Sequence, residues 1–231
     1  MLRDLIVSTW KVIAHTPQTM RGAGWACVGA FAISLFLAIF YKDSLQAAIG
    51  VGFPTPEPKT ITYLVVRFID TFCGGAGMTV IGVAGYVFAR ATKRDALADA
   101  ALVFAAGGFW SFLITGVGQF VFADMRPREG GMMQWFGIHG HGVSGHASAA
   151  SLFLSPARSV FAKNKSRATH NAIAFAFFSW ALFIGWSRIY LDMHHTWNVV
   201  LGLSLGFFCA HAASKAYAQR AQSATNNTGT T

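Results

Sequence analysis

Charged side chains are scarce in this sequence. They make up 12% of its 231 residues, whereas 54% of the residues are hydrophobic and the mean hydropathy is +0.45. Soluble domains carry about 25% charged residues. So few charges cannot cover a folded chain of this size with polar surface. We therefore interpret the chain as an integral membrane protein.

Cysteine is nearly as rare. Cys27, Cys73 and Cys209 form no Cys-x2-Cys pair and lie in apolar runs, so we interpret them as small hydrophobic residues without a disulfide framework. The first twenty residues lack an unbroken apolar stretch and a small-residue cleavage site, and we expect no cleavable signal. The apolar runs carry no Lys, Asp or Glu near their middle, which disfavours an ion-coupled transporter.

The apolar runs predict the fold class. A bilayer core of about 30 Å needs roughly 20 apolar residues per helix. Six stretches are nearly free of Asp, Glu, Lys and Arg, and they predict an all-α, six-transmembrane helix bundle. These stretches cover residues 22–41, 71–89, 100–123, 144–162, 171–187 and 196–214.

Basic residues predict the orientation of the bundle. Arg90, Lys93 and Arg94 follow the second stretch, and residues 158–167 hold four more Lys or Arg. Because Lys and Arg in short loops mark the cytoplasmic side, we expect both termini in the cytoplasm. The net charge of +9 is then a topology signal and requires no nucleic acid partner. This topology leaves residues 42–70, 124–143 and 188–195 as outer loops.

The ends of the chain have simpler predictions. Residues 2–13 predict an amphipathic helix, either at the membrane interface or packed on the bundle. We expect three parts: an N-terminal amphipathic segment (1–21), a membrane domain (22–215) and a disordered cytoplasmic tail (216–231).

Three local patterns stand at helix ends on the predicted outer side. They are Gln119-x6-Arg126-Pro127, Ser144-Gly145-His146, and Ser187-Arg188-x5-His194-x3-Asn198. In order and spacing they resemble the type 2 phosphatidic acid phosphatase family. That family has Lys-x6-Arg-Pro, Pro-Ser-Gly-His and Ser-Arg-x5-His-x3-Asp on a six-helix membrane core. The resemblance covers residues 119–198.

The resemblance implies roles for these residues. Arg126 and Arg188 would hold the phosphoryl group by bidentate hydrogen bonds, aided by Ser144 and Gly145 at a helix start and by Gln119 as a neutral contact. His194 would attack phosphorus, His146 would protonate the leaving oxygen, and Asn198 would orient His194. No metal or other cofactor is implied.

Gln119, Val143 and Asn198 depart from the family pattern, where Lys, Pro and Asp stand. The loss of the lysine removes a positive charge, and the loss of the aspartate removes an anionic partner of His194. Asn198 could orient His194 through its carbonyl oxygen, or Asp192 or Asp124 could supply the missing charge. Alternatively, the pocket suits a phosphodiester of lower charge. If Asn198 orients His194, Asn198→Asp should raise turnover on phosphomonoesters.

The resemblance thus implies a phosphoric ester hydrolase of the cell inner membrane. It would remove phosphate from a lipid-linked phosphate or diphosphate at the periplasmic face, with membrane lipids as its other partners. A lipid phosphotransferase or phosphodiester-cleaving relative is the first alternative. A rhomboid-like intramembrane serine protease is a less favoured alternative. Gly142-Val143-Ser144-Gly145 and His195 with Gly202 and Gly206 imitate the sequence pattern of those proteases. The sequence does not indicate an oligomeric state.

Two further patterns have competing interpretations. His139, His141 and His146 could bind zinc or copper, or could instead contact the phosphate or headgroup. Trp135, Phe136 and Trp197 border the predicted site and could line a hydrocarbon-chain entrance, although interface anchoring is the favoured interpretation.

Overall fold

The computed structural model describes residues 1–15, 22–52, 60–73, 75–121, 134–135, 138–139, 142–153 and 166–228. The described chain is helical apart from one short antiparallel pair, in which Gln134 lies opposite His139. The expected all-α class is confirmed. The elements are α1 (Leu2–Ala14), α3 (Ala23–Gly52), α4 (Ile61–Cys73), α5 (Gly75–Ala91), α6 (Asp95–Val121), β1 (Gln134–Trp135), β2 (Ile138–His139), α7 (Gly145–Ser151), α9 (Arg167–Tyr190) and α10 (Thr196–Thr228).

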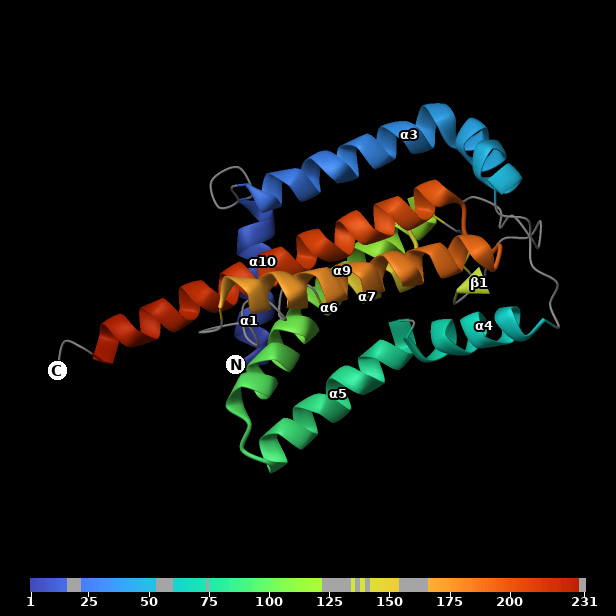
Figure 1. The fold of residues 1–231 in the computed structure, drawn as a ribbon. Helices are drawn as coiled ribbons and strands as arrows, with labels where there is room; N and C mark the ends of the chain where they lie inside the picture. Colours follow the sequence, from blue (N-terminus) through green and yellow to red (C-terminus); the bar gives the residue numbers. More distant parts are fainter. Residues whose placement is uncertain are drawn as a thin grey trace.

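Helix α10 forms the centre of the bundle. It contacts α1, α3, α6, α7 and α9 along its length (Figure 1). Its side chains Leu201, Leu205 and Cys209 are buried with Val143 and Leu152 in one apolar cluster. This central position explains why 67% of its most apolar window is buried, against 28% for α9.

Three described helices are long and apolar enough to cross a membrane. They are Asp95–Gln119, Arg167–Tyr190 and Thr196–Ser223, and they match the third, fifth and sixth predicted spans. A shorter apolar helix, Gly24–Leu37, falls within the first, and another, Val80–Ala91, overlaps the second. Of the fourth, only the part up to residue 153 lies in the described chain. Six spans therefore stay a prediction, as does the orientation of the termini.

The expected outer loop 42–70 is wrong over most of its length. Helix α3 continues to Gly52, and α4 covers Ile61–Cys73. Residues 61–73 were not predicted as a helical span because they contain the charged residues Arg67 and Asp70. However, Arg67 and Thr71 are four residues apart on one face of α4, where both line a pocket. A helix with such a polar stripe is still a helix.

Helix α1 is confirmed, and it packs on the bundle. Leu5 and Val12 are each 2% exposed and join buried residues of α6 and α10 in one core cluster. The indole Nε1 of Trp110 donates a hydrogen bond to the backbone oxygen of Ile6 at 2.9 Å. The ring of Trp110 also stacks on Trp10, with 4.7 Å between ring centroids. These contacts attach α1 to α6.

The prediction of a disordered tail at residues 216–231 is corrected by the structure. Helix α10 continues to Thr228, so the chain after residue 215 is helical almost to its end. Alanine, glutamine and arginine, which favour helices, dominate the first turns of this segment. The hydroxyl of Tyr217 also donates a hydrogen bond to the carboxylate of Asp99 on α6, which fixes the start of the extension.

Two glycines bring α7 and α10 into backbone contact. A Cβ atom at Gly202 would clash with the backbone oxygen of Ser144, and one at Gly206 would clash with the backbone oxygen of Ser148. Small residues four apart permit this close approach of membrane helices. Helix α7 is thereby held against the first three turns of α10.

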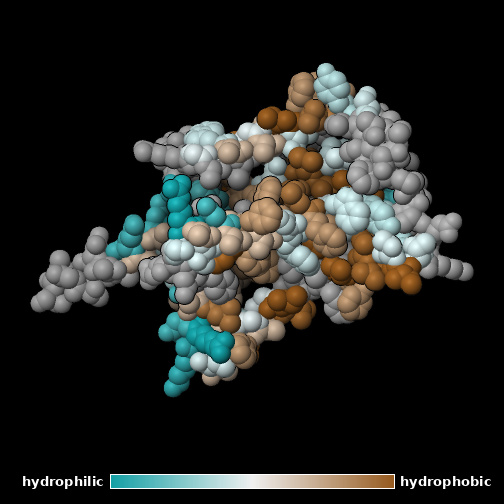
Figure 2. Space-filling view, viewed as in Figure 1, coloured by the Kyte–Doolittle hydropathy of each residue, from teal (hydrophilic) through white to brown (hydrophobic). Residues whose placement is uncertain are grey.

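The polar surface gathers at one end of the molecule. Figure 2 shows the strongest hydrophilic colour around the α5–α6 turn and the C-terminal half of α10, whereas brown, tan and pale residues of higher hydropathy cover much of the rest of this face. Arg90, Lys93 and Arg94 lie at that turn. Figure 1 places the α9–α10 turn at the opposite end of the bundle.

Candidate functional site

The α9–α10 turn positions Arg188 and His194. Asp192 adopts a left-handed backbone conformation (φ 57°), and the backbone N–H of Met193 donates to the oxygen of Arg188 at 3.0 Å. The N–H of Asp192 donates to Ile189, which completes a Schellman motif at the end of α9. The N–H of His194 also donates to the Arg188 oxygen, at 3.2 Å. The motif runs from Arg188 to Met193, and His194 follows it directly. This is why five residues separate Arg188 from His194.

Asn198 fixes the other side of the turn. It is the third residue of α10, and its Oδ1 accepts a hydrogen bond from the backbone N–H of His195 at 2.9 Å. A side chain at this position that bonds back to the residue before the helix forms half of a capping box. The amide Nδ2 of Asn198 donates to the backbone oxygen of Gly142. Asn198 thus joins two segments and is itself fully buried.

Ser144 is an N-cap, and its own polar groups are engaged. Its Oγ accepts from the N–H of Ala147 at 3.5 Å, and its backbone N–H donates to the backbone oxygen of Asn198 at 2.9 Å. The side chain is fully buried and does not line the pocket described below. Gly145 and His146, in the first turn of α7, are the residues of this motif that do.

Gln119 contributes from the last turn of α6. Its Nε2 donates to the backbone oxygen of Val143 at 3.1 Å, so it holds the segment that enters α7. Gly118, the residue before it, lies close to the same segment, because a Cβ there would be 2.7 Å from Cγ2 of Val143. Gln119, which stands where the resembled family has lysine, therefore lies beside the segment that enters α7.

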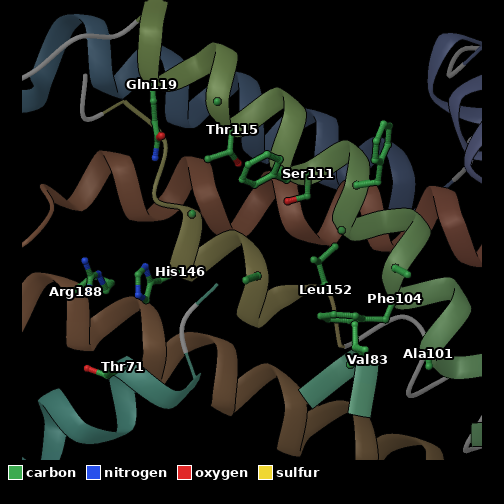
Figure 3. Close-up of a pocket in the computed structure, with 18 of the residues that line it drawn as sticks. Thr71, Val83, Ala101, Phe104, Ser111, Thr115, Gln119, His146, Leu152 and Arg188 are labelled. Carbon is green, nitrogen blue, oxygen red and sulfur yellow. The ribbon is translucent and has the colours of Figure 1, made fainter. Parts of the chain in front are cut away.

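A cavity of about 1220 Å³ brings these residues together. Gln119, His146, Arg188 and His194 line its polar end, and Figure 3 shows His146 and Arg188 side by side, with Gln119 opposite them on α6. Arg188 and His194 are only 4% and 5% exposed. A buried guanidinium at the end of a cavity makes stronger hydrogen bonds to an anion than it would in water.

The other end of the cavity is apolar. It continues between α5, α6 and α7, past Leu152 and Phe104, to Val83 and Ala101 (Figure 3). From Gln119 to Ala101, α6 rises by about 27 Å, close to the thickness of a bilayer core. The cavity therefore joins a small cationic end to a long hydrocarbon-lined limb.

Several predicted residues lie outside the described part of the chain. They are Arg126, Asp124, His141 and Phe136, and the side chains of His139 and Trp135 also fall outside it. Within the described residues, no group of three or more His, Cys, Asp or Glu is arranged to hold a metal ion. Trp197 is described and is 5% exposed in the core cluster of α10, where it packs with Val143.

Sequence reasoning missed Arg67 and Thr115, which line the same cavity. Arg67 lay in a segment predicted as a loop. Its Nη1 donates to the hydroxyl of Tyr63 at 3.0 Å, and Tyr63 packs on Leu191 of the α9–α10 turn. For Thr115 a signal was present, because it stands four residues before Gln119 on an otherwise apolar helix.

Together these features define a helical membrane protein with a cavity that is cationic at one end and apolar along its length. A family model, described as the PAP2 superfamily, matches residues 100–222, more than half of the chain. The chain belongs to the PAP2 superfamily, whose members act as phosphatases and phosphotransferases on phosphate-containing substrates. No curated protein and no solved structure matches the chain. The family membership decides against the rhomboid-like alternative.

Proposed function

We propose that this protein is a lipid phosphatase that removes phosphate from a lipid-linked phosphate or diphosphate through a phosphohistidine intermediate on His194. The shape of the cavity is the observation that supports a lipid as the substrate. A water-soluble phosphate ester needs only the polar end, whereas a limb lined by Phe104, Leu152 and Val83 suits a hydrocarbon chain. We place this reaction at the outer, periplasmic face of a cell inner membrane.

The first chemical step is an attack on phosphorus by a ring nitrogen of His194. Nδ1 of His194 is buried, so Nε2 is the nitrogen left for attack. As the N–P bond forms, the P–O bond to the lipid breaks, and the electron pair leaves with the lipid oxygen. His146 gives that oxygen a proton. Arg188 holds the phosphoryl oxygens, with Arg126 as a second guanidinium from the outer loop.

The second step returns the enzyme to its starting state. Water attacks the phosphorus of phosphohistidine and loses a proton to His146, and the N–P bond breaks with its electron pair on His194. An alcohol in place of water would give phosphate transfer with the same balance. Backbone N–H groups at Gly145 and His146 stand at the start of α7, where an anion is favoured.

In this proposal, Arg67 compensates for the charge that Gln119 does not supply. It lines the same cavity, and its helix packs through Tyr63 and Val66 on Leu191, in the turn that carries Arg188 and His194. The hydrogen bond from Arg67 to Tyr63 restricts the guanidinium on α4. A phosphomonoester could then be neutralised without a lysine at position 119.

Purified protein in detergent, assayed for phosphate release with EDTA present, tests the proposal. The panel contains phosphatidate, phosphatidylglycerol phosphate, a polyprenyl diphosphate and a soluble phosphate ester. We expect release from at least one lipid, and loss of that release in His194→Ala. His195→Ala is the matched control, because only the backbone of His195 contacts Asn198 in the bond described above.

Three results would speak against the proposal. Equal release by His194→Ala would remove the nucleophile, and a preference for the soluble ester would remove the lipid substrate. The absence of phosphate release, together with transfer of phosphate to an added alcohol, would make the protein a phosphotransferase.

A further inference from the structure

Thr115 is a buried hydroxyl residue within α6. It is 5% exposed, it lines the cavity, and its Oγ1 has no hydrogen-bond partner among the described residues. Hydroxyls within helices ordinarily donate to the carbonyl four residues earlier. Six described hydroxyls do so, at 2.6 to 3.0 Å: Thr9, Ser34, Thr71, Thr92, Ser151 and Ser223.

A buried hydroxyl without a partner requires an explanation, because it loses its hydrogen bonds to water and gains none. A Cβ at Gly145 would lie 3.7 Å from the methyl carbon of Thr115, so the methyl group faces the start of α7. Because Thr115 lines the cavity, a molecule bound there can supply the missing acceptor.

Thr115 belongs to a polar stripe on α6. Ser111, Thr115 and Gln119 are four residues apart, all three line the cavity, and Figure 3 shows them along the same side of α6. Successive members are about 6 Å apart along the helix axis. One turn deeper than Thr115, Ser111 shares a hydrogen bond with Ser148 of α7. Two hydroxyls that share one bond keep one O–H to donate elsewhere.

The order of groups along the cavity is therefore cationic, then hydroxylic, then apolar. In a glycerolipid phosphate the order is phosphate, then ester oxygens, then hydrocarbon. Covalent bonds of about 1.5 Å separate phosphorus from the nearest ester oxygen by roughly 5 Å, close to the 6 Å between Gln119 and Thr115. An isoprenoid phosphate has no polar atoms beyond its phosphates.

We propose that Thr115, with the Ser111 and Ser148 pair behind it, donates hydrogen bonds to the acyl-ester oxygens of a glycerolipid substrate. These hydroxyls then select ester-linked lipid phosphates over ether-linked and isoprenoid ones. The proposal rests on the proposed function only in using the same cavity. Thr115 determines specificity and takes no part in the transfer of phosphate.

The test compares phosphatidate with its dialkyl ether analogue of equal chain length in mixed micelles. The wild-type ratio of kcat/KM, ester over ether, should be about tenfold, the factor expected for one hydrogen bond. In Thr115→Val, which replaces the hydroxyl by a methyl group of similar size, the ratio should fall to near one. Thr115→Ser should keep the preference, and Thr92→Val, outside the cavity, should leave the ratio unchanged.

A binding measurement separates this proposal from the failure of the phosphatase assignment. In the His194→Ala background, which cannot turn over, phosphatidate should raise the midpoint of thermal unfolding more than the ether lipid does. Thr115→Val should abolish that difference, and Thr115→Ala serves if the valine variant does not fold. An unchanged ratio or shift, or an equal loss on both lipids, would overturn the proposal, because Thr115 would then be inert or would contact the phosphate.

Discussion

Asn198 donates a hydrogen bond from its side-chain amide to the backbone oxygen of Gly142, 56 residues earlier in the chain. Its Oδ1 accepts from the N–H of His195 at the same time. An amide can donate and accept at once, whereas an ionised carboxylate can only accept. The asparagine that stands in place of the family's aspartate is therefore suited to joining the start of α10 to the segment that enters α7.

We predict that Asn198→Asp lowers both stability and turnover, the reverse of the expectation from the family pattern. A carboxylate can still accept from His195, but it faces the Gly142 oxygen without a proton to donate. A buried acceptor left without its donor costs about 1–3 kcal/mol. Thermal unfolding in detergent and phosphate release would measure the two effects. A rise in turnover would instead show that this position acts on the ring of His194.

The contact between α7 and α10 makes a second prediction. Gly206→Ala places a methyl group against the backbone oxygen of Ser148 and the hydroxyl of Ser151, and we expect a cost of about 1–3 kcal/mol from overpacking. Gly85→Ala is the control, because no atom lies within 4 Å of its Cβ position. That variant should match or exceed the wild-type unfolding temperature. Equal behaviour of the two variants would contradict the close contact.

The attachment of α1 can be tested with two apolar positions on the same helix. Leu5 is 2% exposed and Val7 is 48% exposed. Leu5→Ala should destabilise the protein by about 2–5 kcal/mol, whereas Val7→Ala should change stability by less than about 0.5 kcal/mol. Unfolding of both variants in detergent gives the comparison. If Val7→Ala costs more, α1 uses its other face.

The charge compensation proposed for Arg67 can be tested by moving the charge. Arg67→Ala should lower kcat/KM on a lipid phosphomonoester about tenfold or more, because a charged hydrogen-bond donor is lost. Adding Gln119→Lys to that variant should recover part of the loss, since Gln119 lines the same end of the cavity. No recovery, with a lower unfolding temperature, would assign Arg67 to the packing of α4.

The orientation of the bundle requires labelling in intact cells. In a background without the three native cysteines, Ile61→Cys should react with an impermeant reagent added from outside, because Ile61 is 81% exposed at the site-bearing end. Lys93→Cys, at the basic α5–α6 turn, should react only after the cells are opened. The opposite pattern would place the site on the cytoplasmic side.

The sequence predicted what depends on local spacing. Arg188, His194 and Asn198 have the intervals of a Schellman motif followed by a capping box, and such motifs are built from neighbouring residues. Helices α6, α9 and α10 were found because they are long and apolar. In contrast, α4 was missed because Arg67 interrupts its apolar sequence, and no local pattern reveals that Arg67 lines a cavity.

The role of Asn198 could not be read from the sequence either, because its second partner, Gly142, is distant in the chain. Thr115 was overlooked for a related reason. A threonine in an apolar helix is ordinary until the structure shows that it lacks the usual carbonyl partner.

The glycine contact between α7 and α10 has a consequence for how the protein responds to its bilayer. Membrane helices respond to a change of bilayer thickness by tilting. Of the three long apolar helices, α9 is the least buried inside the protein, so we expect it to tilt most readily. The starts of α7 and α10 are fixed to each other through backbone atoms at Gly202 and Gly206. A change of membrane thickness should therefore affect the entry of the lipid into the cavity more than it affects the distance between His146 on α7 and His194 before α10.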